Sequence, residues 1–149
     1  MVSPVVTAST NANQTHTYTN TGPYTVTLQV ESSSGCLSIV FSLPIIVSPN
    51  PVVDFSLPNV CLPSGSASFN SLSTISDGTG NLFTYSWNFG DASAVGSGQS
   101  PVHIYSATGP YTVSLTVTSN NGCVTTASKS LTTIYAEPEA KFTAPLKFV

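Results

Sequence analysis

The sequence predicts an all-β protein built from Greek-key β-sandwiches in tandem, and three observations support that prediction. The chain has 149 residues, of which 40% are hydrophobic and 6% charged. Residues that suit a pleated sheet, such as Val and Thr, are common, whereas the charged helix formers are scarce. Apolar and polar residues alternate in short runs between turn residues, and one long segment occurs twice.

The repeated segment recurs after 87 residues. Residues 15–36 align with residues 102–123 without a gap, and 13 of the 22 aligned positions are identical. The same offset aligns residues 51–58 with residues 138–145 near the end of the chain. Self-similarity at a fixed period is typical of proteins built from repeated structural units.

This offset predicts the domain organisation. We expect residues 1–48 to be the C-terminal half of one repeat, residues 49–135 to be a complete repeat, and residues 136–149 to be the first strand of another. The chain would then be a stretch of a longer array, or its terminal pieces would complete one another between chains by strand addition. We favour the array, because the two pieces together still lack the segment from residue 63 to residue 87.

The individual strands follow from local patterns. Residues 111–118 alternate strictly, which predicts a strand with Tyr111 and every second residue after it buried. Residues 83–89 alternate in the same way and place four aromatic side chains on one face. The Asn-Gly chemistry of residues 119–122 predicts a tight hairpin turn. Further strands are expected around Phe55, around Phe69 and over residues 124–134, where imperfect alternation allows a bulge.

Two motifs in the complete repeat resemble those of the PKD (polycystic kidney disease) domain family. These are "YSWNFGD" and, shortly after it, "PVHIYSATGPYTVSLTVTSNNG". The resemblance implies an immunoglobulin-like sandwich, and arrays of such copies resemble those of large adhesins in Bacteroidota-type bacteria. Ala92 stands where the family commonly has Gly, so a different turn is expected there. The core motif comprises Trp87, Phe89, Gly90, Asp91, His103, Tyr105, Gly109 and Tyr111.

Each motif residue has a structural and a functional interpretation. Trp87 and Phe89 would form either the core or an exposed sugar-binding platform, and their alternation with other aromatics favours the core. Tyr111, or else Tyr105, is expected to form a tyrosine corner, in which the hydroxyl bonds to the backbone. Asp91 is expected to stabilise the turn after its strand, and His103 to form structural hydrogen bonds.

Metal and disulfide sites have weaker support. Asp77, Asn81, Asp91 and loop carbonyls would be the ligands of a calcium ion, which some PKD domains of collagenases use. The "DGTGN" segment lacks the dense acidic spacing of a dedicated site, so we expect neither calcium nor any other cofactor. Two cysteines per sandwich would either form a Cys61–Cys123 bridge, as in exported domains, or remain free thiols.

Charge and motif content exclude several functions. Three lysines and no arginine leave no cationic cluster for nucleic acid or for an anionic membrane surface, and no apolar run is long enough to insert into a bilayer. No nucleophile elbow or phosphate-binding loop is present. We therefore predict a non-enzymatic spacer and adhesive module of a large extracellular or cell-surface bacterial protein. Its partners would be neighbouring repeats, surface glycans or other proteins. The alternative is an accessory polymer-binding module of a secreted hydrolase.

Overall fold

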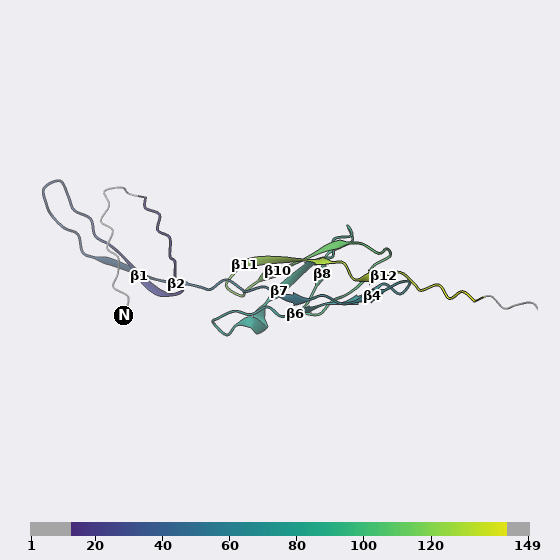
Figure 1. Ribbon diagram of the computed structural model, residues 1–149. Helices are drawn as coiled ribbons and strands as arrows, with labels where there is room; N and C mark the ends of the chain where they lie inside the picture. Colours follow the sequence, from purple (N-terminus) through teal and green to yellow (C-terminus); the bar gives the residue numbers. More distant parts are fainter. Residues whose placement is uncertain (1–12, 143–149) are drawn as a thin grey trace, which may run out of the picture. The chain divides into compact units, whose positions relative to one another are not determined.

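The computed structural model describes residues 13–142, apart from the side chain of Asn81. The chain divides between Ser48 and Pro49 into two compact units. Within the described residues the regular structure is β-strand, apart from the short 3-10 helix η1 (Gly80–Leu82) (Figure 1). This confirms the all-β prediction. None of the helical structure in this part of the chain has the length and hydropathy needed to span a bilayer.

The first unit contains one antiparallel hairpin. Its strands are β1 (Gly22–Leu28) and β2 (Phe41–Val47). Tyr24 lies opposite Ile45, and the register continues to the pair Leu28 and Phe41. Because directly opposed residues of an antiparallel pair point to the same side, Tyr24, Val26 and Leu28 of β1 share one face with Ile45, Leu43 and Phe41 of β2.

The second unit is a sandwich whose larger sheet has the order β11, β10, β7, β8. The predicted strand over residues 111–118 is confirmed as β10. The pairing of β10 with β11 runs unbroken from Thr118 opposite Val124 to Tyr111 opposite Leu131, without the bulge that the sequence allowed. The strands of this sheet are β7 (Thr84–Asn88), β8 (Gly96–Ser97), β10 (Tyr111–Thr118) and β11 (Val124–Leu131).

The opposite layer consists of shorter strands. They are β3 (Phe55–Ser56), β5 (Ser66–Ser68), β6 (Asn70–Ser71) and β9 (Val102–Ile104). β6 pairs with β3, and β5 pairs with β9. Backbone N–H groups of Phe69 and Ser71 donate to the carbonyls of Pro101 and Gln99, which extends this ladder along the segment before β9. Together these strands cover one face of the larger sheet.

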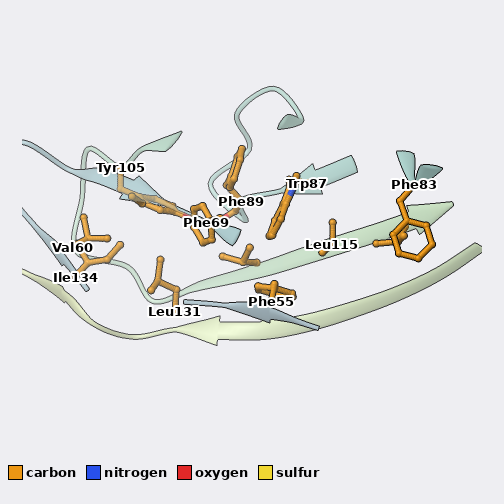
Figure 2. Packing of buried hydrophobic residues seen from close by; sticks show 13 residues of the cluster. Phe55, Val60, Phe69, Phe83, Trp87, Phe89, Tyr105, Leu115, Leu131 and Ile134 are labelled. Carbon is orange, nitrogen blue, oxygen red and sulfur yellow. Dashed lines mark hydrogen bonds between the residues drawn. The ribbon is translucent and has the colours of Figure 1, made fainter. Parts of the chain in front are cut away.

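The core between the two layers is built around Trp87. Its side chain is completely buried, and its ring centroid lies 5.2 Å from that of Phe55 and 5.6 Å from that of Phe69 on the opposite layer (Figure 2). Aromatic rings at these separations attract each other beyond the gain from burial. The other buried apolar residues are Val60, Ala67, Phe83, Phe89, Tyr105, Val113, Leu115, Val117, Leu131 and Ile134.

The chain enters and leaves the sandwich at opposite ends. Near the entry, Val52 forms a bridge with Thr74. The chain then runs in the same direction as β11: the Lys129 ammonium donates to the Phe55 carbonyl, and β4 (Val60–Cys61) later pairs in parallel with β12 (Ile134–Tyr135). The entry therefore lies near the start of β11, and the exit follows β12 at the far end.

Candidate functional site

The core-motif residues gather where β7 ends. The Asn88 side-chain carbonyl accepts a hydrogen bond from the Gly90 N–H at 2.9 Å, and Gly90 has a φ of +82°. A Cβ at this position would lie 2.4 Å from the Thr112 carbonyl oxygen. Glycine is therefore required both by the backbone conformation and by the approach of β10.

The turn after Gly90 has a left-handed backbone at Ala92, where the family commonly has glycine. Ala92 has a φ of +62°, the sole positive φ of a non-glycine residue in the described chain. Asp91 stabilises this turn, because its Oδ1 accepts hydrogen bonds from the Ser93 N–H at 3.2 Å and from the Ser93 hydroxyl at 2.6 Å. Ala92 thus occupies the left-handed region, which glycine adopts most readily.

Asp91 also contacts His103 from β9. The Nε2 atom of His103 lies 2.7 Å from the second carboxylate oxygen of Asp91, and the two side chains are 14% and 17% exposed, respectively. The imidazole stacks on Phe89 with a centroid distance of 4.1 Å and an angle of 6°. Burial raises the pKa of Asp91, but hydrogen bonds from Ser93 and His103 outweigh it and leave the pKa below its ordinary value.

This lowered pKa predicts how stability depends on pH. As pH falls, Asp91 takes up a proton in the unfolded chain before it does so in the folded one. The stability that the Asp91 carboxylate contributes is therefore fully present above its ordinary pKa of 3.8, and it is lost as pH falls through the lower pKa of the folded state. We expect Asp91→Asn to lower the free energy of unfolding by about 1 to 3 kcal/mol at neutral pH. Urea denaturation across pH should show the difference from wild type shrinking below pH 3.8. A difference that is the same at all pH values would contradict the assignment.

Two tyrosines complete the cluster. Tyr105 is completely buried, and its hydroxyl donates to the Phe89 carbonyl at 3.0 Å. Burial, with the nearby charge of Asp91, raises the pKa of Tyr105. Tyr111 stacks on Tyr105 with a centroid distance of 4.6 Å, and its hydroxyl donates to the carbonyl of Ala107, four residues upstream, at 3.4 Å. The bond of Tyr111 to an upstream carbonyl fits a tyrosine corner.

The same contacts occur in the first unit at positions 87 residues earlier. His16 packs edge-on against Tyr18, Tyr18 packs against Tyr24, and the Tyr24 hydroxyl donates to the carbonyl of Asn20 at 2.9 Å. The hairpin turn also recurs: the N–H of Ser32 donates to the Cys36 carbonyl at 2.9 Å, as that of Ser119 does to Cys123. The repeated sequence thus forms the same local structure twice.

The aromatic row of β7 faces the core. Phe83, Trp87 and Phe89 are each less than 10% exposed, and the Trp87 indole N–H donates to the Gly98 carbonyl at 2.9 Å. Tyr85, in the same row, is partly buried against the core. The predicted burial is confirmed, and these rings do not form an exposed platform.

The candidate calcium ligands Asp77 and Asp91 do not come together. Asp77 lies in the turn before η1, close to the start of β7, where Thr84 pairs with Thr118. Asp91 follows the opposite end of β7. Each carboxylate is instead bonded within its own turn, Asp77 by Thr79. The side chain of Asn81 lies outside the described part. Among the described residues, no group of three or more His, Cys, Asp or Glu side chains is placed to hold a metal.

The cysteines are free thiols, which corrects the alternative of a Cys61–Cys123 bridge. Cys61 lies opposite Tyr135 in β12, whereas Cys123 precedes β11 at its opposite end. Eight strand residues at about 3.3 Å each separate the two ends by about 25 Å, and a disulfide needs Cα atoms within about 7 Å.

Two polar contacts were missed by reasoning from the sequence. The Asp91–His103 pair joins residues whose patterns in the sequence are unrelated. Lys129 contacts the carboxylate of Asp54 at 2.6 Å and lies over the Phe55 ring. The available signal for Lys129 was its position on the inward face of an alternating strand. A lone lysine there needs an acceptor nearby.

The arrangement as a whole defines a structural module. Every buried side-chain N or O atom in the described residues has a hydrogen-bond partner, and the polar groups of the cluster bond to one another and to backbone. Polar side chains held in this way stabilise a turn, as Asp91 does, or a contact between strands, as Tyr105 does with the Phe89 carbonyl. The fold is an immunoglobulin-like β-sandwich, in which this cluster joins the end of β7 to β9 and to the start of β10.

Comparison with known proteins identifies the family. The family model described as "PKD domain" matches residues 48–134, and the chain belongs to this family. Collagenase ColA of Clostridium perfringens is 39% identical over 62 residues, which are 42% of this chain and 6% of the collagenase. The chain therefore spans a small fraction of the length of that relative.

Solved structures include further PKD domains. The PKD1 domain of Epp from Vibrio anguillarum is 31% identical, with a TM-score of 0.51 over 60% of this chain and 99% of that one. The PKD1 domain of the metalloprotease PrtV from Vibrio cholerae is 28% identical, with a TM-score of 0.46 over 57% of this chain and 95% of that one. Sequence similar to part of this chain therefore occurs in a collagenase, and the fold of the second unit is similar to that of a solved PKD domain.

Proposed function

We propose that the chain is a non-catalytic spacer in an extracellular or cell-surface protein, in which copies of the sandwich follow one another in line. The observation that carries this proposal is the position of the chain ends in the second unit. Entry lies near the start of β11, and exit follows β12 at the other end. A module of this kind adds its whole length to an array, whereas one with adjacent ends would add little.

The length of each module follows from strand geometry. β11 and β12 run from Val124 to Tyr135, and twelve residues at about 3.3 Å each give about 40 Å. Pro49 and Pro51 restrict the backbone where the next copy would begin. A core closed within the unit allows each copy to fold without its neighbours. The restricted backbone at Pro49 and Pro51 would then keep successive copies extended and the array stiff.

The spacer function predicts how length grows with copy number. Proteins with one, two and four copies of residues 49–135, each preceded by residues 47–48, should show a maximum dimension that increases by about 40 Å per copy. Small-angle X-ray scattering measures this dimension. A dimension that stops increasing after two copies would contradict the proposal, because the modules would then be folding back on one another.

The second candidate is an accessory polymer-binding module of a secreted hydrolase, and it is favoured by the similarity to collagenase ColA. Burial of Trp87 and Phe89 weighs against it, because these rings cannot stack on a polymer. The same proteins can be sedimented with insoluble collagen. Under the spacer proposal they stay in the supernatant at every copy number. Retention that increases with copy number would favour the accessory module and would count against a purely spacing role.

A further inference from the structure

The hairpin of the first unit exposes an apolar face that its equivalent in the second unit buries. Leu28 is 61% exposed and Phe41, directly opposite it, is 63% exposed. Soluble proteins rarely leave contiguous apolar faces in water unless these are binding sites. We call this surface the hairpin face, and it consists of Tyr24, Val26 and Leu28 of β1 with Phe41, Leu43 and Ile45 of β2.

The second unit shows what covers the corresponding face there. Leu115 is the equivalent of Leu28 at the 87-residue offset, and it is completely buried. It belongs to one core cluster with Phe55, Phe69 and Trp87. All three of these aromatic residues come from the segment 49–101, which precedes residues 102–123, the counterpart of residues 15–36. The covering layer is therefore supplied by that segment.

The backbone edge of β1 shows the same difference. β10 pairs with β11 on one side and with β7 on the other, where Leu115 lies opposite Trp87. Within residues 13–142, β1 pairs with β2 alone. An exposed strand edge presents unpaired N–H and C=O groups that can accept another strand. Among the described residues, the hairpin thus has neither a second neighbouring strand nor a covering layer.

The register of the hairpin makes this face more apolar than its buried equivalent. Near the turn, Glu31 pairs with Leu37, as Thr118 pairs with Val124. Leu28 pairs with Phe41. Between these two pairs, the chain of β1 advances by three residues and that of β2 by four, as in a β-bulge. The extra residue shifts β2 by one position, which turns Phe41, Leu43 and Ile45 toward the hairpin face. In β11 the matching positions hold Ala127, Lys129 and Leu131, so the difference lies at the first two.

We propose that the hairpin face binds a polypeptide segment with the chemistry of residues 49–101, which adds a strand to the free edge of β1 and covers the face with aromatic side chains. The added strand would carry the equivalent of Trp87 opposite Leu28, in the register that β7 has with β10. Binding of this kind combines backbone pairing with burial of alternate side chains. The proposal does not depend on the spacer function.

The test supplies this segment within the full chain. A second copy of residues 49–101 is placed directly before Thr15, which is the position it has relative to Val102 in the second unit. We expect a new cooperative unfolding transition and amide exchange in β1 that is at least about 100-fold slower than in the original chain. Hydrogen exchange with mass spectrometry measures both chains under the same conditions.

Two variants of the extended chain distinguish specific covering from non-specific collapse. Leu28→Asp places a charge on the hairpin face and should abolish the slow exchange of β1. Thr27→Asp places the same charge on the other face of the same strand and should leave the slow exchange in place. Equal behaviour of these variants would overturn the proposal. So would unchanged exchange in the extended chain, or dimerisation of the original chain through Leu28 in analytical ultracentrifugation, since a second copy would then be the occupant.

Discussion

Trp87→Ala is expected to destabilise the second unit by about 3 to 5 kcal/mol, which is the usual loss when a buried aromatic side chain is truncated. Trp87 is completely buried and packs against rings from the opposite layer. Truncation also leaves the Gly98 carbonyl without the indole N–H that it accepts. Urea denaturation followed by circular dichroism measures the loss, because the variant has no tryptophan left to report by fluorescence.

A neighbour in the same strand provides the control for Trp87. Ser86 is exposed and lies in β7 next to it, so Ser86→Ala should change stability by less than about 0.5 kcal/mol. Trp87→Phe keeps an aromatic ring but removes the bond to Gly98, and it should fall between the two. A nearly neutral Trp87→Ala would show that the ring is not part of the core, and would return the sugar-platform interpretation to consideration.

Gly90→Ala is expected to cost about 2 to 5 kcal/mol. One part, about 1 to 2 kcal/mol, comes from forcing a residue with a Cβ into the left-handed region, since Gly90 has a φ of +82°. The other part, about 1 to 3 kcal/mol, comes from overpacking, because the new Cβ would lie 2.4 Å from the Thr112 carbonyl oxygen. Backbone on one side or the other must move. Denaturation of the full chain measures the combined effect.

Gly122→Ala isolates the steric part. Gly122 has nearly the same backbone angle, with a φ of +78°, but a Cβ there would meet nothing within 4 Å. This variant should therefore lose only the conformational contribution of about 1 to 2 kcal/mol. If both alanine variants lose the same amount, the close approach of Thr112 to Gly90 has no energetic consequence, and the requirement for glycine is conformational alone.

Much of the candidate site could be predicted from the sequence because its residues are in or beside strong patterns. The alternation around Trp87 predicted its burial, and the position of Asp91 after a strand predicted its bonding within a turn. The pairing of Asp91 with His103 could not be predicted, because it depends on how β9 lies against the end of β7. Alternation indicates which face a side chain takes, but not which residue of another strand it meets.

Separations across the sandwich were also beyond the sequence. Cys61 and Cys123 are equally consistent with a bridge or with free thiols until the lengths and directions of β4 and β11 are known. Asp77 and Asp91 both lie in loops and could, from the sequence, share a metal site. In the structure the strand β7 runs between them and holds them at its two ends. In both cases a strand of known length keeps the groups apart.

The sequence by itself determined the all-β class, the family, the 87-residue repeat and the inward faces of the main strands. The class and the inward faces depend on local alternation and turn chemistry, which neighbouring residues set without reference to the rest of the chain. The repeat and the family follow from the order of the residues alone. The tertiary structure decided the one-residue shift of β2, the Asp91–His103 contact and the opposite positions of chain entry and exit. The physical reason is that strand register and layer packing are set by contacts between segments distant in the chain, where one added residue redirects every side chain beyond it.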